Sequence, residues 1–484
     1  MTDAASIVAC ALAATVAAPV AGAIATRARS AQGHARAITA WTLATSATCA
    51  TAASWAWATC DACSPGWAWT FGPGTPGNEL VRFDALTAVL LPYALVLALA
   101  TALAVPQRDL GSGSAGGMLS GAASTAALLS TAQPAALAVL WVATAFTTWR
   151  MAGSEPSGRP AARAYAAYMV PAVVLMAVGA WLLASTPAGS TAHAAGAWLL
   201  TGAVMVRKGI VPFHSWYPAL FSGAPVATAL NATMPQVAAY TAVRLLVSHG
   251  TEVQPQLGVL AAASLVTCVY GAALAVAQRD VRGLVGALAV SQSALVLAGL
   301  ADGTQAELSG AIAVWVASGI VLTGVALVAR SLEARAGTLV ITAPQGRFAD
   351  APGLAACFLL FGLAGAGLPG TFSFIADDLI VSGSLDHRPG AGLMVIASTV
   401  LAAIALMRGW FRVFGGQPAH GPRHPVLRRE AAAFAVLLAA TFTLGLFPAP
   451  FVRAAERVAA SVVPTPNEPA NVDPTQSSSP PRSH

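Results

Sequence analysis

The chain has 484 residues, of which 56% are hydrophobic and only 9% are charged, and its formal net charge is +6. Because a typical soluble domain is about 25% charged, this composition is typical of an integral membrane protein. The basic residues form no continuous run and no basic–aromatic patch, which argues against nucleic-acid binding.

Apolar segments long enough to cross a bilayer, about 20 residues each, recur along the chain. They are too long and too rich in Ala and Leu to be strands of a barrel. The sequence therefore predicts an all-α polytopic membrane protein with about 14 transmembrane helices. These segments lie at about 4–26, 37–60, 83–105, 115–131, 132–152, 163–185, 191–216, 226–249, 256–278, 281–301, 306–330, 354–384, 391–412 and 430–450.

The arginines alternate between the connections, which predicts the orientation. Odd-numbered connections contain Arg27, Arg29, Arg36, Arg108, Arg150, Arg159, Arg163, Arg279, Arg282, Arg330, Arg335, Arg347, Arg408, Arg412, Arg423, Arg428 and Arg429, whereas even connections and the tail contain Arg82, Arg388, Arg453, Arg457 and Arg482. The positive-inside rule predicts that the odd connections are cytoplasmic. Both termini are then expected on the extracytoplasmic side of the cell (inner) membrane. The tail from residue 464 is rich in Pro and Ser and is predicted to be disordered.

Lys208 is the only lysine among the 25 Lys and Arg residues, and it lies inside the seventh apolar segment. An ionisable residue at membrane depth costs about 2.5–3.5 kcal/mol on insertion scales, which makes it a candidate functional residue. A buried lysine can release its proton near neutral pH, whereas arginine effectively cannot. We therefore interpret Lys208 as a switching base and Arg207 as a fixed positive charge. The alternative is that Lys208 merely survived a compositional drift towards arginine.

Two segments contain helix breakers, and charged residues adjoin both. Gly209 and Pro212 interrupt the seventh segment, and residues 365–370 interrupt the twelfth just before Asp377 and Asp378. Interrupted helices in the two halves of a chain point to the midplane site of a transporter. The alternatives are an ordinary proline kink and carboxylates near water at a helix end.

We treat Asp377 and Asp378 as candidate acids, since carboxylate oxygens suit coupling to H⁺ or Na⁺. His214, beside the first break, is a candidate proton relay or a structural hydrogen-bonding group. Arg244 is expected to snorkel outward or to form a structural pair, and Glu307 is expected to be hydrated at a span end.

No cofactor or metal site is predicted. The chain has no Gly-rich dinucleotide fingerprint and no iron–sulfur set of cysteines. Cys60 and Cys63 are too few to bind a metal by themselves and are more consistent with an optional disulfide.

Four segments together resemble a known family. Residues 207–218 (RKGIVPFHSWYP), 223–226 (GAPV), 278–284 (QRDVRGL) and 367–377 (GLPGTFSFIAD) are similar to motifs of the antiporter-like, proton-conducting membrane subunits of complex I (NADH-quinone oxidoreductase) and of Mrp-type cation/proton antiporters. The similarity runs in order through about residues 80–415.

The resemblance implies two inverted five-helix repeats, each with a broken helix. It divides the chain into N-terminal helices 1–3 (1–105), a first repeat (106–250), a second repeat (251–415), helix 14 (416–463) and the tail (464–484). It also implies a central axis of titratable side chains that moves protons, and partner membrane subunits in the bilayer.

The chain departs from the family pattern at several axis positions. The family's acid on the fifth helix corresponds to Val142, and its lysine on the eighth helix corresponds to Gln236. Family histidines correspond to Ser318 and to Leu230 or Asn231. Arg207 occupies the position of the seventh-helix lysine, and Lys208 lies one residue further on. Gln236 and Ser318 can hold water but cannot store a proton.

The resemblance implies a proton-translocating, non-redox subunit of a complex I-related assembly, and no catalytic cofactor in this chain. Three alternatives stay open: a proton-coupled subunit of an inorganic-carbon (bicarbonate) uptake complex, an Mrp-type Na⁺/H⁺ antiporter subunit, and a structural membrane subunit that has lost conduction.

Overall fold

The computed structural model describes residues 2–28, 33–59, 67–70, 79–301, 304–417 and 422–462. The predicted disordered tail and the Cys60–Cys63 pair lie outside these ranges. The α-helices are α1 (Thr2–Ala25), α2 (Ala35–Ala58), α3 (Ala85–Ala104), α4 (Ser112–Leu128), α5 (Pro134–Ala152), α6 (Arg159–Ser185), α7 (Thr191–Lys208), α8 (Trp216–Gly223), α9 (Val226–Thr233), α10 (Val237–Leu245), α11 (Gln254–Ala277), α12 (Val281–Ala301), α13 (Gln305–Ala336), α14 (Pro352–Gly365), α15 (Phe372–His387), α16 (Pro389–Phe414), α17 (Arg428–Leu446) and α18 (Ala449–Val462).

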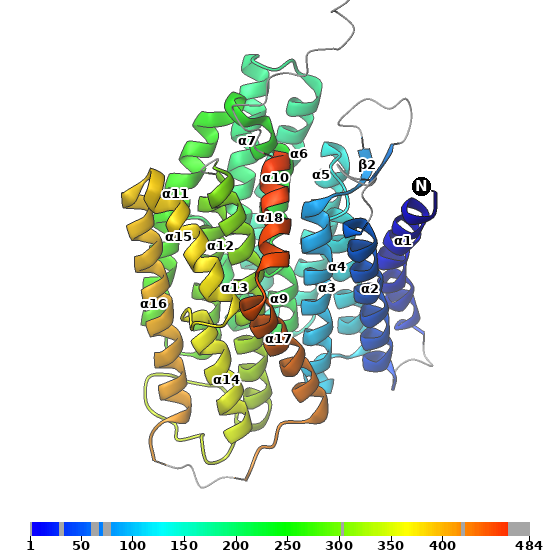
Figure 1. Cartoon of the computed structure of the whole chain (residues 1–484). Coiled ribbons are helices and arrows are strands. Elements are labelled where there is room, and N and C mark those ends of the chain that lie inside the picture. Colours follow the sequence, from blue (N-terminus) through cyan, green and yellow to red (C-terminus); the bar gives the residue numbers. More distant parts are fainter. Residues whose placement is uncertain are drawn as a thin grey trace, which may run out of the picture.

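Short 3₁₀ helices and one β-ribbon complete the described structure. The 3₁₀ helices are η3 (Gln107–Asp109), η4 (Pro156–Gly158) and η5 (Val247–Val253), and the antiparallel strands are β1 (Trp67–Thr70) and β2 (Glu79–Phe83). The ribbon precedes α3 and lies at one end of the bundle (Figure 1).

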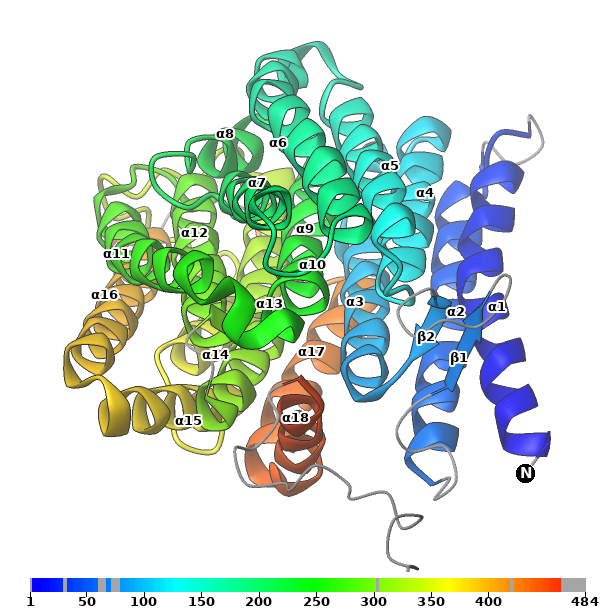
Figure 2. The ribbon, with the colours of Figure 1, turned by 90° about the horizontal axis from the view of Figure 1, so that it is seen from above.

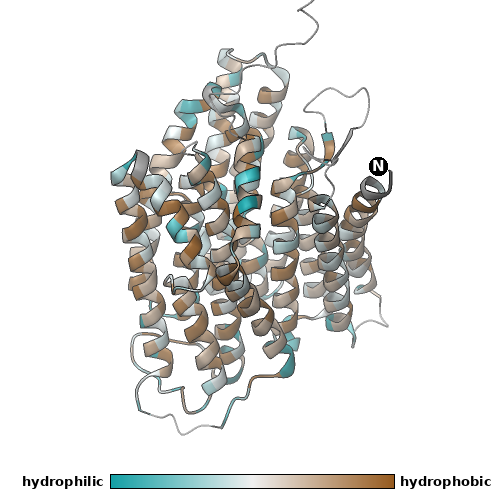
Figure 3. Ribbon diagram, in the orientation of Figure 1, coloured by the Kyte–Doolittle hydropathy of each residue, from teal (hydrophilic) through white to brown (hydrophobic). Residues whose placement is uncertain are grey.

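Long helices run side by side and form one elongated bundle, with α1 and α2 at one edge and α16 at the other (Figures 1 and 2). Within the described residues, nine helices are long and apolar enough to cross a membrane. Hydrophobic residues cover the length of these helices, while many hydrophilic residues lie at their ends (Figure 3). The predicted polytopic, mostly helical membrane fold is therefore confirmed.

The centre of the second half is the 32-residue helix α13, whose residues from Glu307 to Glu333 are buried without interruption. A helix that is apolar on all sides must be covered on all sides. Helices α12, α14, α15, α17, α18 and α3 all contact α13. Close approach depends on Gly319, where an added Cβ would lie 1.7 Å from the Tyr93 hydroxyl.

The two predicted helix interruptions are present. Helix α7 ends at Lys208, and Gly209 follows in the left-handed conformation at φ 65° before α8 begins. Helix α14 ends at Gly365, and α15 begins at Phe372. A third interruption was not predicted: the eighth apolar segment divides into α9 and α10 at Gln236, a non-glycine residue with φ 50°.

Three further details refine the predicted elements. The predicted division of residues 115–152 is confirmed, since α4 and α5 are separate helices. The last apolar segment continues into a second helix, α18, which was not predicted. The prediction that Glu307 is hydrated is wrong, because this residue is only 1% exposed. It lies in the first turn of α13, where its backbone N–H donates to the hydroxyl of the capping residue Thr304.

Candidate functional site

Lys208 is the last residue of α7 and is only 1% exposed. Its ammonium donates a hydrogen bond to the side-chain oxygen of Gln236, at the α9–α10 interruption. Its own backbone carbonyl accepts a hydrogen bond of 3.1 Å from the Ser293 hydroxyl on α12. Within the described residues, no carboxylate lies within ion-pair distance of Lys208. The buried ammonium therefore has a neutral side-chain partner.

The end of α7 suits cations for a local reason. Unpaired carbonyls at a helix C-terminus favour positive charge, and both Arg207 and Lys208 occupy the last turn. The left-handed Gly209 then turns the chain away, so that this terminus lies inside the protein instead of extending across the bilayer.

Arg207 is also buried, at 6% exposure, and its contacts are neutral. Its guanidinium donates to the carbonyl of Trp141 at 3.2 Å and to the hydroxyl of Thr144 at 2.7 Å, and it lies 4.5 Å from the centre of the Trp141 ring. Trp141 and Thr144 are thus the α5 residues that contact this cation, and Thr144 supplies the side-chain hydrogen bond. Val142 is 47% exposed and lines an apolar groove with residues of α6.

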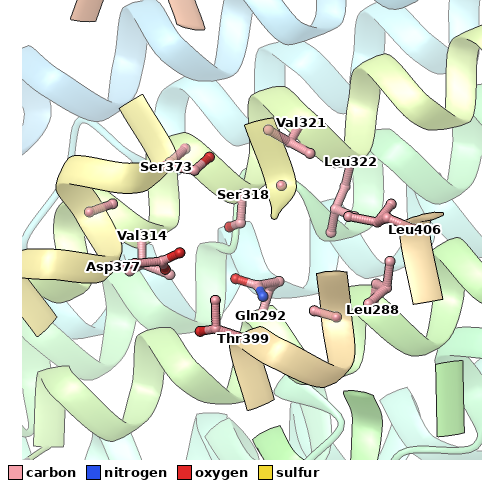
Figure 4. Close-up of a pocket in the computed structure, with 14 residues that line it drawn as sticks. Leu288, Gln292, Val314, Ser318, Val321, Leu322, Ser373, Asp377, Thr399 and Leu406 are labelled. Carbon is pink, nitrogen blue, oxygen red and sulfur yellow. The ribbon is translucent and has the colours of Figure 1, made fainter. Parts of the chain in front are cut away.

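Asp377 lies on α15, just after the second predicted interruption, and lines a cavity of about 30 Å³. The cavity has four other polar lining residues, namely Gln292, Ser318, Ser373 and Thr399. Figure 4 shows the side chains of Asp377, Gln292 and Thr399 lying around the same space. A site needs about 10–15 Å³ and several polar partners to hold a water molecule, so this cavity has room for water.

Asp378 and His214 lie apart from Lys208 and from the Asp377 cavity. Asp378 is exposed on the outer side of α15, so it does not share the cavity of Asp377. His214 lies partly exposed between α7 and α8, where its Nε2 is 3.2 Å from the hydroxyl of Tyr270. The structure therefore does not bring either residue into contact with Lys208.

Helix α12 connects the two buried sites through consecutive residues. Ser293 contacts the Lys208 carbonyl and lies 3.2 Å from the hydroxyl of Tyr217, whereas Gln292 lines the Asp377 cavity. Polar side chains from neighbouring positions thus reach both interruptions. Neither α12 residue was identified as a site residue from the sequence, because serine and glutamine in an apolar helix carry no distinctive motif.

A third buried charged group lies near the β-ribbon. Arg244 on α10 forms two hydrogen bonds with the carboxylate of Asp84, at 2.6 and 2.9 Å, and its guanidinium lies 4.8 Å from the centre of the Tyr240 ring. The prediction of a structural pair for Arg244 is confirmed. Among the residues with described positions, no group of three His, Cys, Asp or Glu side chains could hold a metal ion.

Residues 172–404, which include both interruptions and α12, match the family model described as NADH:quinone oxidoreductase/Mrp antiporter, TM. The chain is similar to this family over just under half of its length. It is also similar to subunit M of NADH-quinone oxidoreductase from Mycobacterium tuberculosis, which is 28% identical over 256 residues, or 51% of this chain and 46% of that protein. Subunit N 3 of the Streptomyces griseus enzyme is 31% identical over 269 residues, or 53% of this chain and 48% of that protein.

The chain thus spans about half the length of the curated relatives that it matches in sequence. The shared fold extends further. A chain of respiratory complex I from Thermus thermophilus superposes with a TM-score of 0.82 at 21% identity, covering 93% of this chain and 99% of that chain. A chain of the Mrp complex from Dietzia superposes with a TM-score of 0.83 at 18% identity, covering 96% and 98%. The fold of these two chains therefore accounts for nearly the whole molecule.

Proposed function

We propose that this chain is a member of the NADH:quinone oxidoreductase/Mrp antiporter family and a proton-translocating subunit of a complex I-related membrane assembly. The observation that carries the proposal is the placement of two ionisable groups at separate helix interruptions that α12 connects: Lys208 is buried, and Asp377 is partly buried and lines an internal cavity. Ionisable groups held away from lipid in this way are the usual elements of a proton path.

We infer that Lys208 takes up and releases the proton, while Arg207 stays charged. Gln236 accepts the ammonium hydrogen bond but does not store a proton. Gln292 and water in the cavity would carry the proton on to Asp377. His214 would act at the exposed side of the first interruption, and Asp378 at the outer side of α15.

The number of membrane spans, the two repeats and the orientation of the termini are part of the same proposal. Counting α7 with α8, α9 with α10, α14 with α15, and α17 with α18 as single spans gives about 14 transmembrane segments. We assign residues 106–250 and 251–415 to two inverted five-helix repeats, with residues 1–105 preceding them and 416–463 following. The arginine pattern supports termini outside the cell membrane.

Exposed charges support partner subunits within the membrane. Helix α18 packs against the candidate span α13, yet its outer face exposes Arg453, Glu456 and Arg457. Helix α18 carries hydrophilic residues and lies alongside the bundle, not beyond its end (Figures 1 and 3). Charged side chains that face lipid are energetically unfavourable. We therefore propose that a partner protein, and not lipid, contacts this face of α18 and Asp378.

The test is proton uptake by inverted membrane vesicles that contain the intact complex, followed with a pH-sensitive dye. We expect Lys208→Ala and Asp377→Asn to abolish most uptake, and the exposed-loop variant Glu155→Gln to keep it. Equal uptake in all three would favour the structural alternative. Replacing Na⁺ with choline separates a proton path from Na⁺/H⁺ exchange, because only exchange then stops.

The inorganic-carbon alternative has its own discriminating measurement. Vesicles of wild type and Lys208→Ala would be compared for accumulation of labelled bicarbonate. Accumulation that depends on Lys208 would replace the complex I-related proposal by that alternative.

A further inference from the structure

We propose that the cytoplasmic end of helices α1, α4 and α5 binds an anionic phospholipid of the bilayer. Its phosphate would lie between Arg27 and Arg150, and one acyl chain would lie in the adjoining groove between α5 and α6. The bilayer supplies such lipids directly, and basic pockets between helices at this side are suited to their headgroups.

The headgroup pocket is a hollow of about 410 Å³, whose lining includes both arginines. Arg27 follows α1, and Arg150 lies in the last turn of α5. Both are exposed, and neither guanidinium forms an ion pair or side-chain hydrogen bond among the described residues. None of the described residues that line the pocket is acidic. Two cations without partners in one pocket favour an anion there.

Glycines of α4 form one wall of the pocket and leave it open. Gly113 and Gly116 both line it, and an added Cβ at Gly113 would meet no atom within 4 Å. The hydroxyl groups of Thr26, Ser120 and Thr147 also line the pocket, but each donates to a backbone carbonyl of its own helix. The arginines are therefore the groups that select negative charge.

The adjoining groove has the opposite chemistry. It has a volume of about 440 Å³ and is lined almost entirely by apolar residues of α5 and α6, including Val142, Trp149, Met169 and Val170. Phe146 lines both the groove and the arginine pocket, so the two spaces adjoin. Trp149, which is 45% exposed, lies where indole rings collect at a membrane interface.

The groove also adjoins the buried cation of the proposed proton path. Tyr165 lines the groove and packs edge-to-face on Trp216, whose indole donates to the carbonyl of Val206. A bound acyl chain would thus support the α5–α6 packing that encloses Arg207. The lipid site itself stands on the pocket and groove, so it is independent of whether the chain conducts protons.

The test compares lipid binding to the purified intact complex by native mass spectrometry, with phosphatidylglycerol and phosphatidylcholine as probes. We expect wild type to prefer phosphatidylglycerol and Arg27→Gln/Arg150→Gln to bind it roughly tenfold more weakly. The control is Arg423→Gln/Arg428→Gln, which removes two exposed arginines before and at the start of α17 and should keep the preference. An unchanged preference in the first variant would overturn the proposal.

A second measurement needs no variant. A phosphatidylglycerol with a photoreactive group on its acyl chain should label peptides of α5 and α6 in the wild-type complex. Labelling that inorganic phosphate abolishes would show that a small anion is the occupant. Crosslinks from this groove to a partner subunit without lipid labelling would show that protein covers it. Either result rejects the lipid site.

Discussion

The guanidinium of Arg244 and the carboxylate of Asp84 form a buried, two-bond ion pair across 160 positions of sequence. Their side chains are 8% and 9% exposed. Asp84 also accepts a hydrogen bond from the backbone of Thr87 and so caps the start of α3. One carboxylate therefore fixes the beginning of α3 and joins it to α10.

This geometry predicts that Asp84→Ala is strongly destabilising. Removing one partner leaves Arg244 buried without a countercharge, which costs roughly 3–5 kcal/mol. Thermal unfolding of the purified protein should show a large fall in melting temperature. The control is Arg82→Ala, which removes a partly exposed neighbour of Asp84 and should cost at most about 1 kcal/mol. Similar losses in both variants would contradict the structural role of the Arg244 pair.

The contact between Lys208 and Gln236 gives a second prediction. Gln236→Leu removes the acceptor of a buried ammonium, which should cost about 1–3 kcal/mol or more and should also reduce proton uptake. Gln236→Glu should keep the protein folded but hold Lys208 protonated, so uptake falls while stability does not. Melting temperature and vesicle uptake, measured on the same preparations, separate these outcomes. Full uptake in Gln236→Glu would argue against proton exchange at Lys208.

Gly319 provides a test of the packing around α13. An added Cβ would overlap the Tyr93 hydroxyl, which now donates to the carbonyls of Met234 and Trp315. Gly319→Ala should therefore cost about 1–3 kcal/mol despite the higher helix propensity of alanine. Gly258→Ala, on α11, is the matched control because no atom lies within 4 Å of the added Cβ. We expect this control to be neutral or stabilising.

His249 in η5 predicts a dependence of stability on pH. Burial, together with repulsion from the nearby His193 side chain, lowers the pKa of His249 below its usual value, although Glu252 opposes the shift. The unfolded chain therefore binds this proton at a higher pH than the folded chain. Stability should be greatest above about pH 6.5 and should fall as the pH drops through the lowered folded value.

His249→Gln should flatten this fall between about pH 7 and 5, as measured by the melting temperature. His34→Gln changes an exposed histidine before α2 and should leave the profile unchanged. A profile that keeps its full slope in His249→Gln would assign the pH effect to another group.

The parts of the site that could be predicted from the sequence are those with a distinctive local pattern of residues. A lone lysine in an apolar segment and the nearby glycines and prolines predicted the interruption after Lys208. The same reasoning identified residues 365–370 as the second interruption. These signals are short-range, because a helix loses backbone hydrogen bonds wherever proline or left-handed glycine occurs.

Other parts depend on contacts that no local pattern contains. The α9–α10 interruption places a glutamine in the left-handed region, where glycine would be the usual residue. The Asp84–Arg244 pair joins residues from two distant helices. The choice of Thr144 instead of Val142 as the neighbour of Arg207 depends on the rotation of α5, since successive helical residues point about 100° apart.

The neighbouring positions of Gln292 and Ser293 on α12 restrict how this protein can evolve. A rotation or shift of α12 that repairs a defect beside Lys208 also displaces a wall of the Asp377 cavity. Second-site mutations that restore function after a substitution beside Lys208 should therefore arise at or beside these two positions. Many of them should impair the Asp377 cavity, and the reverse should hold for substitutions around that cavity. Substitutions in the two halves of the bundle are therefore constrained jointly.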